Sequence, residues 1–91
     1  MKKQPENTTE LKERLRDDVD AQRVSLAEAT RRMRKITGLN QKEYATRIVG
    51  ISPRILAAIE KGAGNPTVET LNKVGKPFGY QVGFTRRHPS A

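Results

Sequence analysis

The chain has 91 residues and a mass of 10.2 kDa, with 18 basic residues, 10 acidic residues and no cysteine. This length accommodates one domain, and the absence of cysteine excludes disulfides and cysteine-based zinc sites. A domain of this size buries only about 60% of its unfolded surface, so association with a second copy is a common remedy. No run of about 20 apolar residues is present, and the polar start lacks the apolar segment of a secretory signal. We therefore expect a cytoplasmic protein without a membrane partner.

The net charge of +8 is distributed unevenly along the chain. Residues 1–24 carry six basic and six acidic residues and are neutral. Residues 25–62 carry eight basic and three acidic residues, a net charge of +5, and residues 63–91 carry four and one, a net charge of +3. Such an excess favours a polyanionic partner, nucleic acid above all, over an anionic membrane surface or simple solubility.

The first predicted element is a polar arm or helix within residues 1–24. Thr8 or Thr9 offers an N-terminal cap, and apolar residues then recur at helical spacing in Leu11, Leu15 and Val19. This narrow stripe predicts a helix that either leans on the main body or forms a partly frayed arm.

Two capping boxes predict the next two helices. In each, the first side chain accepts the third helical N–H and an acid reaches back: Ser25 with Glu28, and Asn40 with Glu43. The first helix has its apolar face at Leu26, Ala29, Met33 and Ile36 and ends at Gly38. The second has its apolar face at Tyr44, Ala45 and Ile48, followed by a tight turn at Gly50.

Two further helices follow the Gly50 turn. Ser52 caps a helix with Pro53 at its first position, and its buried side is predicted at Ile55, Leu56 and Ile59 before it closes at Gly62. Thr67 caps the last helix, which runs to about Val74 with an apolar face at Val68, Leu71 and Val74.

Residues 80–85 alternate strictly and predict a strand. Tyr80, Val82 and Phe84 share one face, and polar or small residues share the other. A single strand cannot satisfy its own backbone groups, so we expect these three residues to form a homodimer interface with the same strand of a second copy. The alternative is that residues 80–91 form a loose tail, in which the single His88 is a surface residue.

The middle of the chain resembles the XRE family, the lambda-repressor and Cro-like DNA-binding proteins. The resemblance covers residues 25 to about 79 and rests on the segments Gly38-Leu39-Asn40-Gln41-Lys42-Glu43-Tyr44-Ala45, Gly50-Ile51-Ser52, Ile59-Glu60-Lys61-Gly62 and Asn65-Pro66-Thr67-Val68-Glu69-Thr70-Leu71. The segment after it is similar to the C-terminal strand of HipB-like antitoxins. One departure is that Ala45 and Gly50 are five positions apart, where the family pattern has four, so the angle between the two motif helices is open.

The resemblance implies a mainly α fold: a lambda-repressor-like helix-turn-helix bundle of about five helices with one short C-terminal β-strand, in which residues 25–79 form the DNA-binding domain. It implies that the helix after Ser52 enters the major groove, with candidate base contacts at Arg54, Ala57, Ala58 and Pro53. Arg54 is the strong candidate because a guanidinium bonds guanine O6 and N7 together. The two alanines either approach thymine methyls or are ordinary helix-forming residues.

Candidate contacts to the DNA backbone are Gln41, which falls at the family's clamping position, and Lys42, Lys61, Arg31, Arg34 and Ser52. For the arginines near the end of the second helix, the helix dipole and solubility are an equally good explanation.

No phosphate-binding loop, metal-ligand cluster or catalytic set is present, so we expect neither an enzyme nor a cofactor. The sequence predicts a dimeric, autoregulatory transcriptional repressor that binds a palindromic operator in double-stranded DNA. The alternatives are the antitoxin of a toxin–antitoxin pair, which also binds its toxin, and a protein–protein adaptor without DNA binding.

Overall fold

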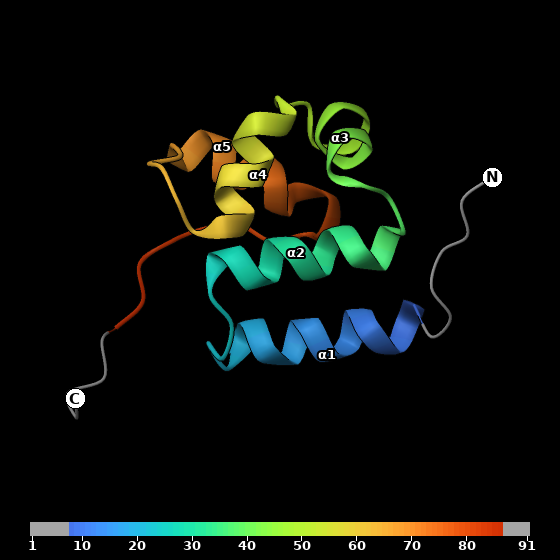
Figure 1. The fold of residues 1–91 in the computed structure, drawn as a ribbon. Coiled ribbons are helices and arrows are strands. Elements are labelled where there is room, and N and C mark those ends of the chain that lie inside the picture. Colours follow the sequence, from blue (N-terminus) through green and yellow to red (C-terminus); the bar gives the residue numbers. More distant parts are fainter. Residues whose placement is uncertain (1–7, 87–91) are drawn as a thin grey trace.

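The computed structural model describes residues 8–86 (Figure 1). The elements are α1 (Thr8–Asp20), α2 (Leu26–Thr37), α3 (Gln41–Glu43), the π-helix η1 (Tyr44–Val49), α4 (Pro53–Lys61), α5 (Val68–Gly75) and the 3-10 helix η2 (Lys76–Phe78). The prediction of a mainly helical bundle is confirmed. Expectations for residues 1–7 and for the basic tail with His88 lie outside the described residues.

Four of the five predicted caps begin helices at their predicted positions, and the fifth, Thr8 or Thr9, lies inside α1. The side-chain oxygens of Ser25, Asn40, Ser52 and Thr67 each accept the backbone N–H three residues later, at 2.8–3.2 Å. Only the Asn40 box is reciprocal, because Glu43 also accepts the backbone N–H of Asn40. These contacts span three residues, which is why the sequence alone predicts where the helices begin.

The core is formed where α2 lies between α1 on one side and α4 with α5 on the other (Figure 1). Its buried apolar residues are Leu15, Met33, Ile36, Tyr44, Ala45, Val49, Leu56, Ile59 and Val74. Every helix except the short α3 and η2 contributes to this cluster. It supplies the hydrophobic stabilisation that holds the short helices at fixed angles.

The N-terminal helix α1 is part of this bundle. Leu15 is completely buried, and Leu11 and Val19 pack against the core, so the apolar stripe is used within the chain. Asp18 accepts hydrogen bonds from Arg32 at 2.7 Å and Arg23 at 3.0 Å, and these bonds hold its pKa below the usual value. Of the two predicted arrangements, a helix leaning on the main body is the one observed.

The extra residue between Ala45 and Gly50 is accommodated by a π-turn. Tyr44–Val49 form a π-helix, and the N–H of Gly50 bonds the carbonyl of Ala45 five residues back at 2.7 Å. This wider turn shifts the side chains after it by one position around the helix axis. Val49 is therefore buried, whereas Ile48, predicted on the apolar face, is 43% exposed.

The C-terminal segment forms no strand within the described residues. Residues 80–82 instead lie against α5, where the N–H of Tyr80 bonds the carbonyl of Gly75 at 2.9 Å and the N–H of Val82 bonds Asn72 Oδ1 at 2.9 Å. The predicted alternation is kept as far as Val82: Tyr80 and Val82 are half-buried and Gln81 is exposed. Phe84 lies beyond the edge of the bundle and is fully exposed. Strand hydrogen bonds need a neighbouring strand, which residues 8–86 do not provide.

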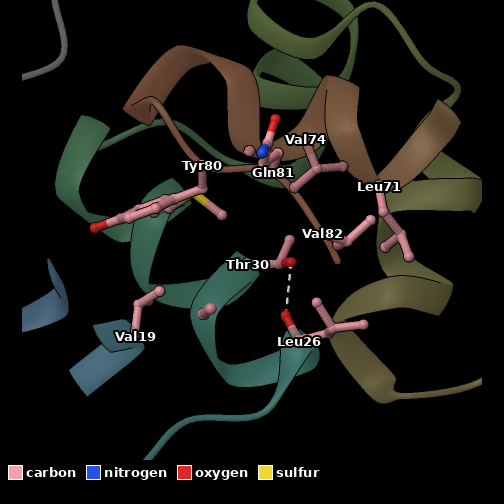
Figure 2. A pocket seen from close by; sticks show the side chains of 11 residues that line it. Val19, Leu26, Thr30, Leu71, Val74, Tyr80, Gln81 and Val82 are labelled. Carbon is pink, nitrogen blue, oxygen red and sulfur yellow. Dashed lines mark hydrogen bonds between the residues drawn. The ribbon is translucent and has the colours of Figure 1, made fainter. Parts of the chain in front are cut away.

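Tyr80 and Val82 border a small apolar cavity between α1, α2 and α5. Figure 2 shows Val19, Leu26, Leu71 and Val74 around it, with the buried Thr30 hydroxyl donating to the carbonyl of Leu26 at 2.7 Å. The cavity volume is about 90 Å³, well below the roughly 300 Å³ at which ligand pockets begin. The cavity is therefore a small packing gap at the point where the C-terminal segment covers the core.

Close packing explains how the C-terminal segment is held at α5. A Cβ atom on Gly75 would lie 2.7 Å from the carbonyl oxygen of Tyr80, so only glycine permits this approach. None of the described helices is long and apolar enough to cross a membrane.

Candidate nucleic-acid interface

The candidate interface is built on α4, which follows the Gly50 turn. Ser52 caps α4, Pro53 occupies its first turn, and Leu56 and Ile59 anchor its inner side in the core. α4 packs against α2, α3 and η1. The elements from α3 to α4 are thus two helical segments joined by a tight turn, with one side of the second segment facing outward.

The outward side of α4 carries the predicted base-contact residues. Arg54 is exposed, and Pro53, Ala57 and Ala58 are half-buried. Lys61 is exposed at the end of the helix, so two cations lie on one face with no acid between them. This side of α4 is therefore positively charged and is lined with small side chains that allow a close approach to a surface.

Ile55 was expected on the buried side of α4 but is 42% exposed. The buried positions are Leu56, Ile59 and Glu60, which centre the inner face away from Ile55. Ile55 instead lies beside Arg54 and Ala58 along a hollow of about 340 Å³. The spacing in the sequence is consistent with this inner face, because Leu56 and Glu60 are one helical turn apart. Glu60 is nevertheless a poor candidate for a buried position, because ionisable residues are rarely found in a core.

Glu60 lies at the centre of a polar network behind α4 and is not among the site residues predicted from the sequence. Its side chain is only 4% exposed, and its carboxylate accepts two bonds from Arg34, at 2.7 and 3.0 Å. Gln41 Nε2 donates a further bond to Oε1 at 3.0 Å. Burial opposes ionisation, but the bonds from Arg34 and Gln41 outweigh it and hold the pKa of Glu60 below its usual value. The network ties α2, α3 and α4 together.

The predicted backbone contacts divide into two groups. Lys42, Ser52 and Lys61 are exposed. Arg34 donates to Glu60 and to the carbonyl of Leu39, and Arg31 donates to the carbonyl of Glu60. Their guanidinium groups therefore hold α4 against α2, and a contact from either arginine to a DNA phosphate stays a prediction.

Gln41 takes an intermediate place. It is half-buried at the first position of α3, and its amide N–H binds the carboxylate that also binds Arg34. This bond fixes the side chain beside α4 while the remaining amide groups stay available. Gln41 is thus oriented by the same network that orients the outer face of α4.

Metal chemistry has no obvious site in the described part of the chain. No group of three or more histidine, cysteine, aspartate or glutamate side chains lies close enough there to hold an ion. Separately, the exposed cations Arg54 and Lys61 give the outer face of α4 a charge that suits an anionic surface.

Comparison with known proteins agrees with this geometry. The family model HTH_3, described as helix-turn-helix, matches residues 31–84, which is more than half of the chain. No curated protein and no solved structure matches the chain. The match spans α3, the Gly50 turn and α4, the elements that form the motif described above. The chain therefore belongs to the helix-turn-helix family of XRE/Cro type, whose members bind DNA.

Proposed function

We propose that the protein is a sequence-specific transcriptional repressor that binds a palindromic operator as a dimer and controls its own operon. The observation that carries the proposal is the outer face of α4. Arg54 and Lys61 are exposed there, and the only acid of the helix, Glu60, is buried and paired with Arg34. A helix of about 10–12 Å diameter fits the major groove, where a guanidinium distinguishes guanine from other bases.

Exposed backbone groups of residues 80–84 support the dimer. Within the described residues, neither Gln81 nor Gly83 makes a hydrogen bond, whereas the N–H groups of Tyr80 and Val82 are bound to the bundle. In an extended chain the backbone groups of Gln81 and Gly83 point to one edge, and those of Tyr80 and Val82 point to the opposite edge. The outer edge is thus free to pair with another strand.

An antiparallel pair with its two-fold axis at Val82 uses this edge fully. Gln81 of each copy then pairs with Gly83 of the other and exchanges both backbone bonds, and Phe84 lies opposite Tyr80 on the bundle side. The fully exposed Phe84 gains an aromatic neighbour, and two α4 helices are held in one particle. Half-sites about one DNA turn, or 34 Å, apart then suit such a dimer.

DNA binding is tested by selection of random duplexes with purified protein. We expect one enriched palindrome and an affinity that falls steeply with salt, because phosphate contacts release counterions. Arg54→Ala should lose the enrichment at one base pair of each half-site, whereas Arg14→Ala, an exposed arginine of α1, should keep it everywhere. Failure to enrich any sequence, together with a salt slope near zero, would favour a protein–protein adaptor instead.

The dimer is tested by analytical ultracentrifugation of Gly83→Pro and Gly83→Ala. Proline removes the outer N–H that each copy donates, whereas alanine keeps it and meets nothing within 4 Å. We expect Gly83→Pro to dissociate and Gly83→Ala to remain dimeric. A dimer of unchanged affinity in Gly83→Pro would place the interface elsewhere.

An antitoxin role is the second candidate, because four large apolar side chains outside α4 are exposed: Leu26, Ile48, Val68 and Phe84. Such groups suit a protein partner in addition to DNA. Co-expression with the product of the neighbouring gene tests this role. A stable complex that Phe84→Asp abolishes would support it, and a chain that never co-purifies with that product would oppose it.

A further inference from the structure

An aliphatic side chain borders the main candidate for base contact on α4. Ile55 is 42% exposed, and it lines the same hollow as Arg54 and Ala58. Arg54 and Ala58 are four residues apart, and Ile55 and Ala58 three, so all three lie on adjoining parts of one helix surface. A guanidinium therefore stands next to an exposed methyl-rich patch at the start of the helix.

The hollow is open to solvent over much of its lining. Its far wall is the loop after Gly62, and most of its lining, including Arg54 and Ile55, is exposed to solvent. A small-molecule pocket encloses 70–90% of its ligand, whereas six of the ten residues that line this hollow are themselves exposed. A flat edge such as that of a base pair fits it better than a buried ligand does.

Only one of the four bases presents an apolar group in the major groove. Thymine carries its C5-methyl there, and guanine offers the paired acceptors that bind arginine. An aliphatic patch next to an arginine therefore corresponds to thymine next to guanine. Polar side chains at positions 55 and 58 would instead have favoured other base edges.

We propose that Ile55 and Ala58 bind the C5-methyl of a thymine that lies within one or two base pairs of a guanine bound by Arg54. The inference rests on the proposed DNA-binding function and adds the class of base that the α4 face selects. Ile55 is in this view a specificity-determining residue. Arg54 supplies the polar contact, and Ile55 with Ala58 supplies the apolar one.

Deoxyuridine is the probe, because it pairs as thymine does but lacks the methyl group. The operator obtained by selection is synthesised with uracil in place of each thymine in turn. Loss of one buried methyl should weaken binding about fourfold, and loss in both half-sites about 15-fold. This loss of affinity should appear at thymines within one or two base pairs of the guanine that Arg54 binds. That guanine is identified as the base that Arg54→Ala no longer selects.

The variant Ile55→Ala assigns the effect to its residue. We expect it to bind the thymine and uracil operators with nearly equal affinity. Ile48→Ala is the matched control, since Ile48 is 43% exposed on η1, outside the hollow beside Arg54. It should keep the full preference for thymine. Circular dichroism confirms that both variants are folded.

The possible outcomes distinguish thymine recognition by Ile55 from the proposed DNA-binding function. Absence of any enriched duplex overturns DNA recognition itself. An enriched operator that tolerates uracil everywhere, or a thymine preference that survives in Ile55→Ala, overturns methyl recognition by Ile55 and leaves the repressor proposal intact. A thymine preference lost in Ile55→Ala and kept in Ile48→Ala supports it.

Discussion

Replacing Glu60 by leucine should destabilise the protein more than any surface substitution. Arg34 is 18% exposed on its side chain and donates two bonds to Glu60. Removing the acid leaves the guanidinium largely buried without its counter-charge, which typically costs 3–5 kcal/mol. Because Arg34 keeps some contact with water and a bond to the carbonyl of Leu39, we expect a loss of about 3 kcal/mol, at the lower end of that range.

The interaction energy between Glu60 and Arg34 is measured with a double-mutant cycle. Glu60→Leu, Arg34→Met and the double variant are unfolded in urea and followed by far-ultraviolet circular dichroism, since the chain has no tryptophan. The double variant should be more stable than Glu60→Leu alone, because it leaves no buried charge behind. A constant slope against urea shows that the change lies in stability and not in the extent of unfolding.

The reasoning fails if Glu60→Leu costs less than about 1 kcal/mol and the two single effects simply add in the double variant. The pair would then be worth no more than an exposed ion pair. Operator binding by the folded double variant is informative as well, because it also removes the acceptor that orients Gln41. We expect weaker binding to all DNA sequences.

Four further predictions follow from the structure. Arg54→Ala should relax selection at one base pair in each half-site and cost about 1–3 kcal/mol on the operator, and equal losses on random DNA would make Arg54 a phosphate contact instead. Tyr44→Phe should raise the free energy of unfolding by about 1 kcal/mol, because the buried Tyr44 hydroxyl has no hydrogen-bond partner within residues 8–86. Burial, together with the charge of Glu60, raises the pKa of this hydroxyl to about 12. A loss of stability in urea unfolding would instead show that the hydroxyl has a partner. The lowered pKa of Glu60 contributes stability that is fully present above its usual value of 4.5 and is lost as pH falls through the lower folded value. In urea unfolding between pH 3 and 7, the free energy of unfolding should therefore fall at the acid end. This fall should be smaller in Glu60→Gln. Deleting the exposed Arg47 should convert η1 into a regular α-turn with little change in thermal stability but altered duplex selection, and an unfolded product would show that the π-turn is required.

Several features of this protein depend on contacts within a few residues, and the sequence alone predicts them. The helix starts at Ser25, Asn40, Ser52 and Thr67 depend on side chains that bond backbone groups three residues away. Glycines after α2, η1 and α4 end those elements in left-handed conformations, which only the glycine backbone adopts without strain. The helix-turn-helix motif is a series of such local signals, so its identification needed no tertiary information.

Other features depend on residues that are far apart in the sequence, and only the folded chain decides them. Whether Arg34 faces solvent or Glu60 depends on how α2 packs on α4, 26 residues later. The same packing turns α4 so that Glu60 is buried and Ile55 is exposed. The π-turn moves Ile48 outward and Val49 inward because one added residue shifts every following side chain. Residues 80–86 show the same limit, because an alternating pattern forms a strand only where a neighbouring strand supplies hydrogen bonds.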